Sequence, residues 1–181
     1  MLLYTHIKSP VGRLKLIASG PHLIAVLWPD DGPLRIRLGD MREEPGHPAL
    51  VETERQLAQY FSGERRRFDL PIHFHGTPFQ HRVWRQLLRI PYGETRSYGH
   101  LAVAVGNRFA ARAVGLANRK NPLSIIVPCH RVIGASGLLT GFAGGLATKA
   151  RLLELEAVMV GRKLGVSRAK PSIEEPTSHI A

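Results

Sequence analysis

The chain has 181 residues, of which 44% are hydrophobic, a single cysteine and a formal net charge of +11. This size and composition suffice for one or two ordinary hydrophobic cores without metals or disulfides. One cysteine excludes an internal disulfide, residues 1–20 lack the features of a secretory signal, and no apolar run approaches the roughly 20 residues that cross a bilayer. We therefore expect a globular protein of the reducing cytoplasm with no membrane partner.

Residues 1–75 alternate short apolar runs with turn residues, which is typical of strands in a small sheet. Residues 14–17 and 23–28 are two such runs, and residues 47–61 have the spacing of a helix with one apolar side. This predicts an α/β domain. Its histidines are scattered and no cysteine joins them, so we expect no metal site and a mainly structural role. These histidines are His6, His22, His47, His73 and His75.

The positive charge is concentrated after this domain. Residues 1–75 carry 10 Lys and Arg against 9 Asp and Glu, whereas residues 76–160 carry 11 against 3. Residues 82–131 alone hold nine basic residues and one acid, Glu94. Such a block is typical of a surface that follows phosphates, although a solubilising basic face has the same composition.

The same region has helical periodicity. Thr77, followed by Pro78 and Gln80, forms a capping box with proline at the first helical position, and the apolar spacing continues to Ile90. The opposite side of this helix carries Arg82, Arg85 and Arg89.

Two shorter helices are predicted next. Ser97 can cap one that continues to Val105, and a second covers residues 109–118. Two short helices joined by a glycine-containing turn among arginines indicate a helix-turn-helix. The small residues of the second helix allow a close approach to a nucleic-acid backbone while Arg112 projects from it. Its inward face is predicted to contain Ala113, Val114 and Ala117.

Cys129 lies between an apolar segment and a His130–Arg131 pair, and both neighbours favour the reactive thiolate. A lone cysteine is more often an inert buried residue, but Pro128 fixes the backbone beside it and histidine is suited to take a proton near neutral pH. In the last predicted helix, residues 146–160, Glu156 has only apolar neighbours at helical spacing. We expect a buried, partnered carboxylate there, unless the helix end frays into water.

Several segments carry a family resemblance. Residues 126–132 (IVPCHRV) resemble the active-site signature of the O6-alkylguanine-DNA alkyltransferases, also called methylated-DNA–protein-cysteine methyltransferases. Residues 91–98 (PYGETRSY), residues 111–115 (ARAVG), the stretch from Asn118 to Pro122, and residues 144–146 with Lys149 resemble further family segments in order and spacing. The resemblance is strong over residues 76–157 and loose before residue 76.

The resemblance implies a fold of two domains. Residues 1–75 would form a structural α/β domain, a small sheet plus helix that is ribonuclease-H-like. Residues 76–160 would form a mainly α-helical, winged-helix-like domain with a helix-turn-helix that binds DNA and accepts the alkyl group. Residues 161–181 match nothing in the family and are expected to be a disordered tail.

The resemblance also implies roles. Cys129 is the nucleophile, His130 is its base through a water because neighbours on an extended chain point apart, and Glu156 orients and charge-compensates His130. Tyr98 is the general acid toward the guanine ring. Arg112 fills the space of the nucleotide extruded from the duplex. The other DNA-contacting residues are Ser97, Ala110, Ala111, Gly115, Arg119 and Arg131, and the supporting residues are Asn121, which braces the helix-turn-helix, Pro128 and Lys149.

The implied partner is double-stranded DNA with O6-alkylguanine, and O4-alkylthymine as a second substrate, contacted in the minor groove. The protein would be nucleoid-associated when bound, a monomer when free and able to assemble cooperatively on DNA. No cofactor is expected, and the zinc of some relatives has no ligand set here. Each molecule would act once because a thioether is not cleaved. Phe142 and Ala143 depart from the family's more polar residues.

Two other interpretations stay open on the residues alone. A non-catalytic alkylguanine-DNA-binding protein of the same fold would lack the cysteine that this chain has. A thiol-sensing DNA-binding regulator would need a resolving cysteine or a partner domain.

Overall fold

The computed structural model of the chain describes residues 1–31 and 38–162. The predicted disordered tail lies outside the described residues from position 163 onward. The N-terminal part is a four-stranded sheet in the order β3-β2-β1-β4. Strands β1 (Leu2–Ser9), β2 (Gly12–Ser19) and β3 (His22–Leu27) pair antiparallel, and the short β4 (Met41–Glu43) runs parallel to β1.

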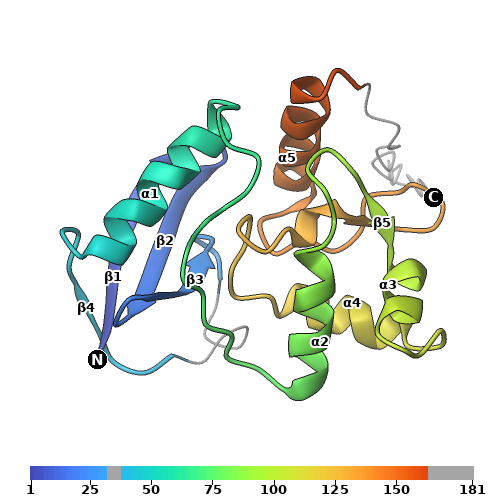
Figure 1. Ribbon diagram of the computed structural model, residues 1–181, viewed down its shortest axis with the longest axis horizontal. Helices are drawn as coiled ribbons and strands as arrows, with labels where there is room; N and C mark the ends of the chain where they lie inside the picture. The colour runs from blue at the N-terminus through green and yellow to red at the C-terminus, as the bar shows by residue number, and fades with distance from the viewer. Residues whose placement is uncertain (32–37, 163–181) are drawn as a thin grey trace, which may run out of the picture.

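Helix α1 (Pro48–Phe61) covers one face of this sheet (Figure 1). Pro48 occupies its first turn, where the absent N–H costs no intrahelical bond. The helix buries Leu50, Leu57 and Tyr60 completely, whereas Phe61 is only partly buried. The last fully buried side chain of α1 is therefore the phenol of Tyr60.

The C-terminal part is mainly helical, as predicted. Its elements are α2 (Pro78–Leu87), β5 (Arg96–Ser97), α3 (Tyr98–Ala104), α4 (Ala111–Arg119), a 3-10 turn (Cys129–Arg131), β6 (Val132–Ile133) and α5 (Leu146–Met159). Strands β5 and β6 pair in parallel and join the start of α3 to the end of the cysteine turn. In Figure 1, α2 to α5 lie together beside the sheet and α1.

The predicted starts of α2 and α3 are confirmed. Thr77 accepts from the backbone N–H of Gln80 while the Gln80 side chain accepts from the N–H of Thr77, and Ser97 accepts from the N–H of His100. Helix α2 ends earlier than expected, at Leu87, because the chain turns there, and Ile90 is buried outside the helix.

Two details of the predicted helix-turn-helix were wrong. Helix α4 begins at Ala111 rather than at Phe109, whose side chain is 81% exposed. Ala113 is also exposed, and lines a groove of about 950 Å³ between α4, the start of α2 and the loop at Phe142. Since α4 is short and packs on α2 and α3 through Val114 and Ala117, its Ala113 side is left open.

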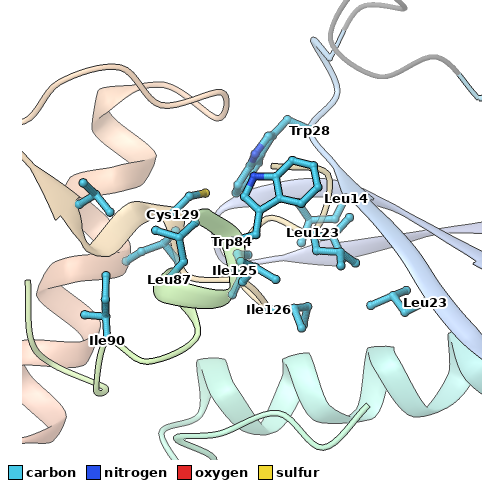
Figure 2. Close-up of a cluster of buried hydrophobic side chains, with 14 of the residues drawn as sticks. Leu14, Leu23, Trp28, Trp84, Leu87, Ile90, Leu123, Ile125, Ile126 and Cys129 are labelled. Carbon is cyan, nitrogen blue, oxygen red and sulfur yellow. The ribbon is translucent and has the colours of Figure 1, made fainter. Parts of the chain in front are cut away.

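The two parts share one hydrophobic core. The backbone N–H of Val26 at the edge of the sheet donates to the Pro122 carbonyl at 2.8 Å, which pairs β3 with the segment before the cysteine. The buried cluster runs continuously from Leu14 and Leu23 to Leu87 and Cys129 (Figure 2). Within the part of the chain that the structure describes, no helix is long and apolar enough to cross a membrane.

Candidate active site

The cysteine segment is buried along its whole length, from Asn121 to Arg131. The Asn121 side chain links two points of this segment. Its amide donates to the Val127 carbonyl at 2.8 Å, and its oxygen accepts from the N–H of Leu123 at 3.0 Å. Asn118, on α4, donates to the Cys129 carbonyl at 3.3 Å. The second helix of the helix-turn-helix therefore holds the cysteine backbone directly.

Cys129 is 3% exposed and begins the 3-10 turn that follows Pro128. The Pro128 carbonyl accepts from the N–H of Arg131 at 3.0 Å, which closes the turn. The expectation of an extended chain at Cys129 and His130 was wrong, because this hydrogen bond coils the backbone. The argument that neighbouring side chains point apart therefore does not apply here.

His130 is completely buried, and its Nε2 lies 2.8 Å from Oε1 of Glu156. Since Glu156 is ionised, Nε2 carries the proton and donates it, which leaves Nδ1 as a proton acceptor. Among the described residues, Nδ1 has no hydrogen-bond partner. Burial lowers the pKa of His130, against the opposing effect of Glu156, so this histidine is a neutral base at pH 7.

Glu156 is fully buried on α5, which confirms the expected burial of this carboxylate. Its Oε1 accepts hydrogen bonds from the hydroxyl of Tyr60, from His130 Nε2 and from Arg131 Nη2. Its Oε2 accepts from Arg131 Nε and from the N–H of Gly93. Burial opposes ionisation, but the hydrogen bond from His130 and the charge and hydrogen bonds of Arg131 overcome it and hold the pKa of Glu156 well below its usual range.

Arg131 does not lie on the DNA-binding surface, so its assignment to DNA contact was wrong. The residue is 6% exposed, and its guanidinium forms a bidentate pair with Glu156 at 2.9 Å for both bonds. Its remaining nitrogen donates to the Ile90 carbonyl at 2.7 Å. Arg131, rather than a protonated His130, therefore supplies the positive charge that balances Glu156.

Lys149 is fully buried on α5, and its ammonium donates to the carbonyls of Val132 and Thr140. It thereby connects the strand that follows the cysteine turn to the loop before α5. Burial lowers the pKa of Lys149 to about 8, while Cys129 raises it. The two groups are therefore close enough to interact electrostatically.

Tyr98 begins α3 and lies on the Cys129 side of the helix-turn-helix. Burial raises the pKa of its phenol, with Cys129 as a further raising charge, so the hydroxyl stays protonated and can donate. Thr140 makes a long contact of 3.4 Å to this hydroxyl. Gly115 of α4 faces the same ring, because a Cβ added there would lie 3.8 Å from Tyr98 Cδ1.

The residues expected to contact DNA lie mainly on α4. Arg112 and Arg119 are exposed, and Ala110 and Ala111 are half-buried at the start of the helix. Arg82 and Arg85 on α2 and Arg89 in the turn after it are exposed as predicted. The helical part of the chain therefore carries these basic side chains on its surface.

The loop before α5 rests on Trp28 of the N-terminal part. The indole N–H donates to Ser124 Oγ at 3.0 Å, and the ring packs edge-on against Phe142 with centroids 5.5 Å apart. A Cβ on Gly144 would lie 2.6 Å from Trp28 Cε2. Glycine is therefore required at position 144 for the loop to lie flat on the indole.

Sequence reasoning missed three residues that hold this site: Trp28, Tyr60 and Asn118. Tyr60 and Asn118 lie in helices and Trp28 directly follows β3, and no pattern in the sequence shows that their polar atoms have partners. Within residues 1–31 and 38–162, no group of three or more His, Cys, Asp or Glu side chains could hold a metal ion.

Two family models match the chain. The ribonuclease-like domain of 6-O-methylguanine DNA methyltransferase matches residues 2–74, and the DNA-binding domain of the same family matches residues 78–158. A methylated-DNA–protein-cysteine methyltransferase of Methanosarcina barkeri is 57% identical over 154 residues, covering 84% of this chain and 96% of the relative. The constitutive enzyme of that name from Bacillus subtilis is 45% identical over 166 residues, covering 88% and 98%.

Among solved structures, the crystal structure of Mycobacterium tuberculosis OGT in complex with DNA aligns with a TM-score of 0.80. Its sequence is 49% identical, and the alignment covers 87% of this chain and 94% of that one. The predicted fold class, a sheet domain followed by a helical DNA-binding domain, is confirmed by these matches.

Proposed function

The chain belongs to the O6-alkylguanine-DNA alkyltransferase family and repairs DNA by transferring an alkyl group to a cysteine, and on that premise we propose how its residues perform the transfer. The acceptor is Cys129, since the chain has no other cysteine. The observation that supports this proposal is the Nδ1 of a neutral, buried His130, which follows Cys129 in the chain and has no hydrogen-bond partner in the described part of the structure. It is a base ready to take the thiol proton.

In the proposed reaction, His130 Nδ1 takes the proton of Cys129 through a bridging water, because Nδ1 has no hydrogen-bond partner among the described residues, and the thiolate attacks the alkyl carbon. The sulfur–carbon bond forms as the bond from carbon to guanine O6 breaks, and the electron pair of that bond passes to the guanine. Tyr98 donates its phenolic proton to the guanine ring, so that the dealkylated guanine remains in the DNA as a neutral base. Glu156 keeps the His130 proton on Nε2, which reserves Nδ1 for the thiol proton.

The product is a thioether on Cys129, which these residues have no means to cleave, so each molecule acts once. No step of this reaction needs a cofactor. The substrate is O6-alkylguanine in duplex DNA, with O4-alkylthymine as a second lesion, bound from the minor groove by α4. Because Cys129 is 3% exposed, the damaged nucleotide must leave the base stack, and Arg112 takes its place in the duplex.

The test is incubation of the protein with a duplex that carries one O6-methylguanine, followed by peptide mass mapping. We expect one methyl group, on the peptide that contains Cys129, and unmodified guanine in the DNA. Cys129→Ser should abolish the transfer and keep most of the affinity for the alkylated duplex, because the exposed basic side chains supply that affinity. A methyl group elsewhere, or turnover beyond one equivalent, would contradict the proposal.

A further inference from the structure

Tyr60 brings a polar group from the N-terminal part of the chain into the site. It lies near the end of α1, and its hydroxyl donates to Glu156 Oε1 at 2.8 Å across 96 residues of sequence. Its ring is fully buried and packs against Phe68 and Tyr92. Burial raises the pKa of this phenol well above its ordinary value, and Glu156 raises it further, so the group remains a donor throughout the pH range of repair.

The Tyr60 hydroxyl and His130 Nε2 share one acceptor atom. Both lie 2.8 Å from Glu156 Oε1, which also accepts from Arg131 Nη2 at 2.9 Å. A hydrogen bond to a carboxylate oxygen reduces the negative charge that the same oxygen offers to its other donors. The Tyr60 hydroxyl therefore reduces the stabilisation that Glu156 gives to a protonated His130. The hydrogen bond from His130 Nε2 to Glu156, which orients the imidazole ring, is kept.

We infer that Tyr60 is a positioning residue for the transfer reaction, whose hydrogen bond to Glu156 Oε1 keeps His130 oriented yet neutral, so that Nδ1 is free to accept the thiol proton. This rests on the proposed function, in which His130 is the base. A carboxylate without the phenol would favour the imidazolium more strongly, and an imidazolium cannot take a proton from Cys129.

Other charged or titratable groups near His130 also influence its pKa, and with it the pH profile of the transfer rate. Arg131 and Lys149 lower the pKa of His130, and Cys129 lies beside it in the same turn. Burial and the charge of Glu156 raise the pKa of Tyr92 in the loop after α2, but the Tyr92 hydroxyl has no hydrogen-bond partner among the described residues. Lys149, with a pKa of about 8, titrates on the alkaline side, so the acid side of the rate profile reports on His130.

The experiment compares Tyr60→Phe with wild type in single-turnover methyl transfer from an O6-methylguanine duplex over a range of pH. Phenylalanine keeps the buried ring and removes only the hydroxyl. The matched control is Tyr92→Phe, because the Tyr92 ring centroid lies 6.0 Å from that of Tyr60 and its buried hydroxyl has no hydrogen-bond partner among the described residues. Circular dichroism confirms that all three proteins are folded.

We expect the acid limb of the Tyr60→Phe profile to move up by about 0.5 to 1 pH unit, which lowers the rate on that limb about 3- to 10-fold and leaves the plateau little changed. Tyr92→Phe should superimpose on wild type. An NMR titration of the histidine rings should show the same upward shift for His130. Overlapping profiles, a downward shift, or a shift shared by Tyr92→Phe would overturn the inference. If wild type itself transfers no methyl group to Cys129, the proposed function fails instead.

Discussion

Replacing Glu156 with glutamine is the sharpest test of the buried network. Five hydrogen bonds converge on the two carboxylate oxygens, three on Oε1 and two on Oε2. Glutamine has one amide oxygen and one NH₂ group, so in either orientation at least two of these donors face another donor. Arg131, with 6% of its surface exposed, also loses the charge that balances it.

The loss of stability in Glu156→Gln follows from the burial of the Glu156–Arg131 ion pair. Removing one partner of a buried ion pair costs about 3–5 kcal/mol. A domain has a total stability of only about 5–15 kcal/mol, so the variant should fold but unfold at a clearly lower denaturant concentration. Glu154→Gln, two residues away on the exposed side of α5, is the matched control and should stay within about 0.5 kcal/mol of wild type.

The stability difference should also depend on pH. The pKa of Glu156 is lower in the folded protein than in the unfolded chain, so its stabilisation is complete above the unfolded value of about 4.3 and is lost as the pH falls further. The gap between wild type and Glu156→Gln should therefore be full at pH 7 and narrow below about pH 4. Urea unfolding at several pH values measures it.

The transfer rate of Glu156→Gln near neutral pH should fall by about 10- to 1000-fold, because His130 loses the acceptor that fixes its tautomer. Part of the loss should return as the pH approaches the ordinary thiol pKa of about 8.5, where the thiolate forms without a base. The assay is the single-turnover rate against pH at a temperature at which both proteins are folded. Coincident profiles for wild type and Glu156→Gln would refute this account of the site.

Two further substitutions test the surface and the loop. Arg112→Ala should slow transfer from a fully paired duplex by about tenfold while leaving a single-stranded substrate nearly unaffected, since only the duplex has a stack to fill; equal losses on both substrates would remove its role in extrusion. Gly144→Ala should lower the unfolding free energy by about 1–3 kcal/mol and slow transfer, because the added Cβ would lie 2.6 Å from Trp28. Gly39→Ala, where a Cβ meets nothing within 4 Å, is its control, and equal stability of the two variants would show that the loop does not depend on this contact.

The sequence by itself determined the local features of this protein. The caps at Thr77 and Ser97 depend on residues three positions apart, and the burial of Glu156 follows from the spacing of its own helix. The positive charge of residues 82–131 is likewise a property of the residues themselves. These interactions form between near neighbours, so the order of residues is enough to predict them.

Only the tertiary structure decided which groups meet at Glu156. Arg131 belongs to the basic block by composition, yet it turns inward because a buried carboxylate without a counter-charge would be more costly than the loss of one surface arginine. Tyr60 reaches the same carboxylate across 96 residues, and Trp28 reaches Ser124 across an equal separation. Periodicity identifies a side chain as buried, but its partner is fixed by how the sheet and the helices pack, and that packing carries no local signature in the sequence.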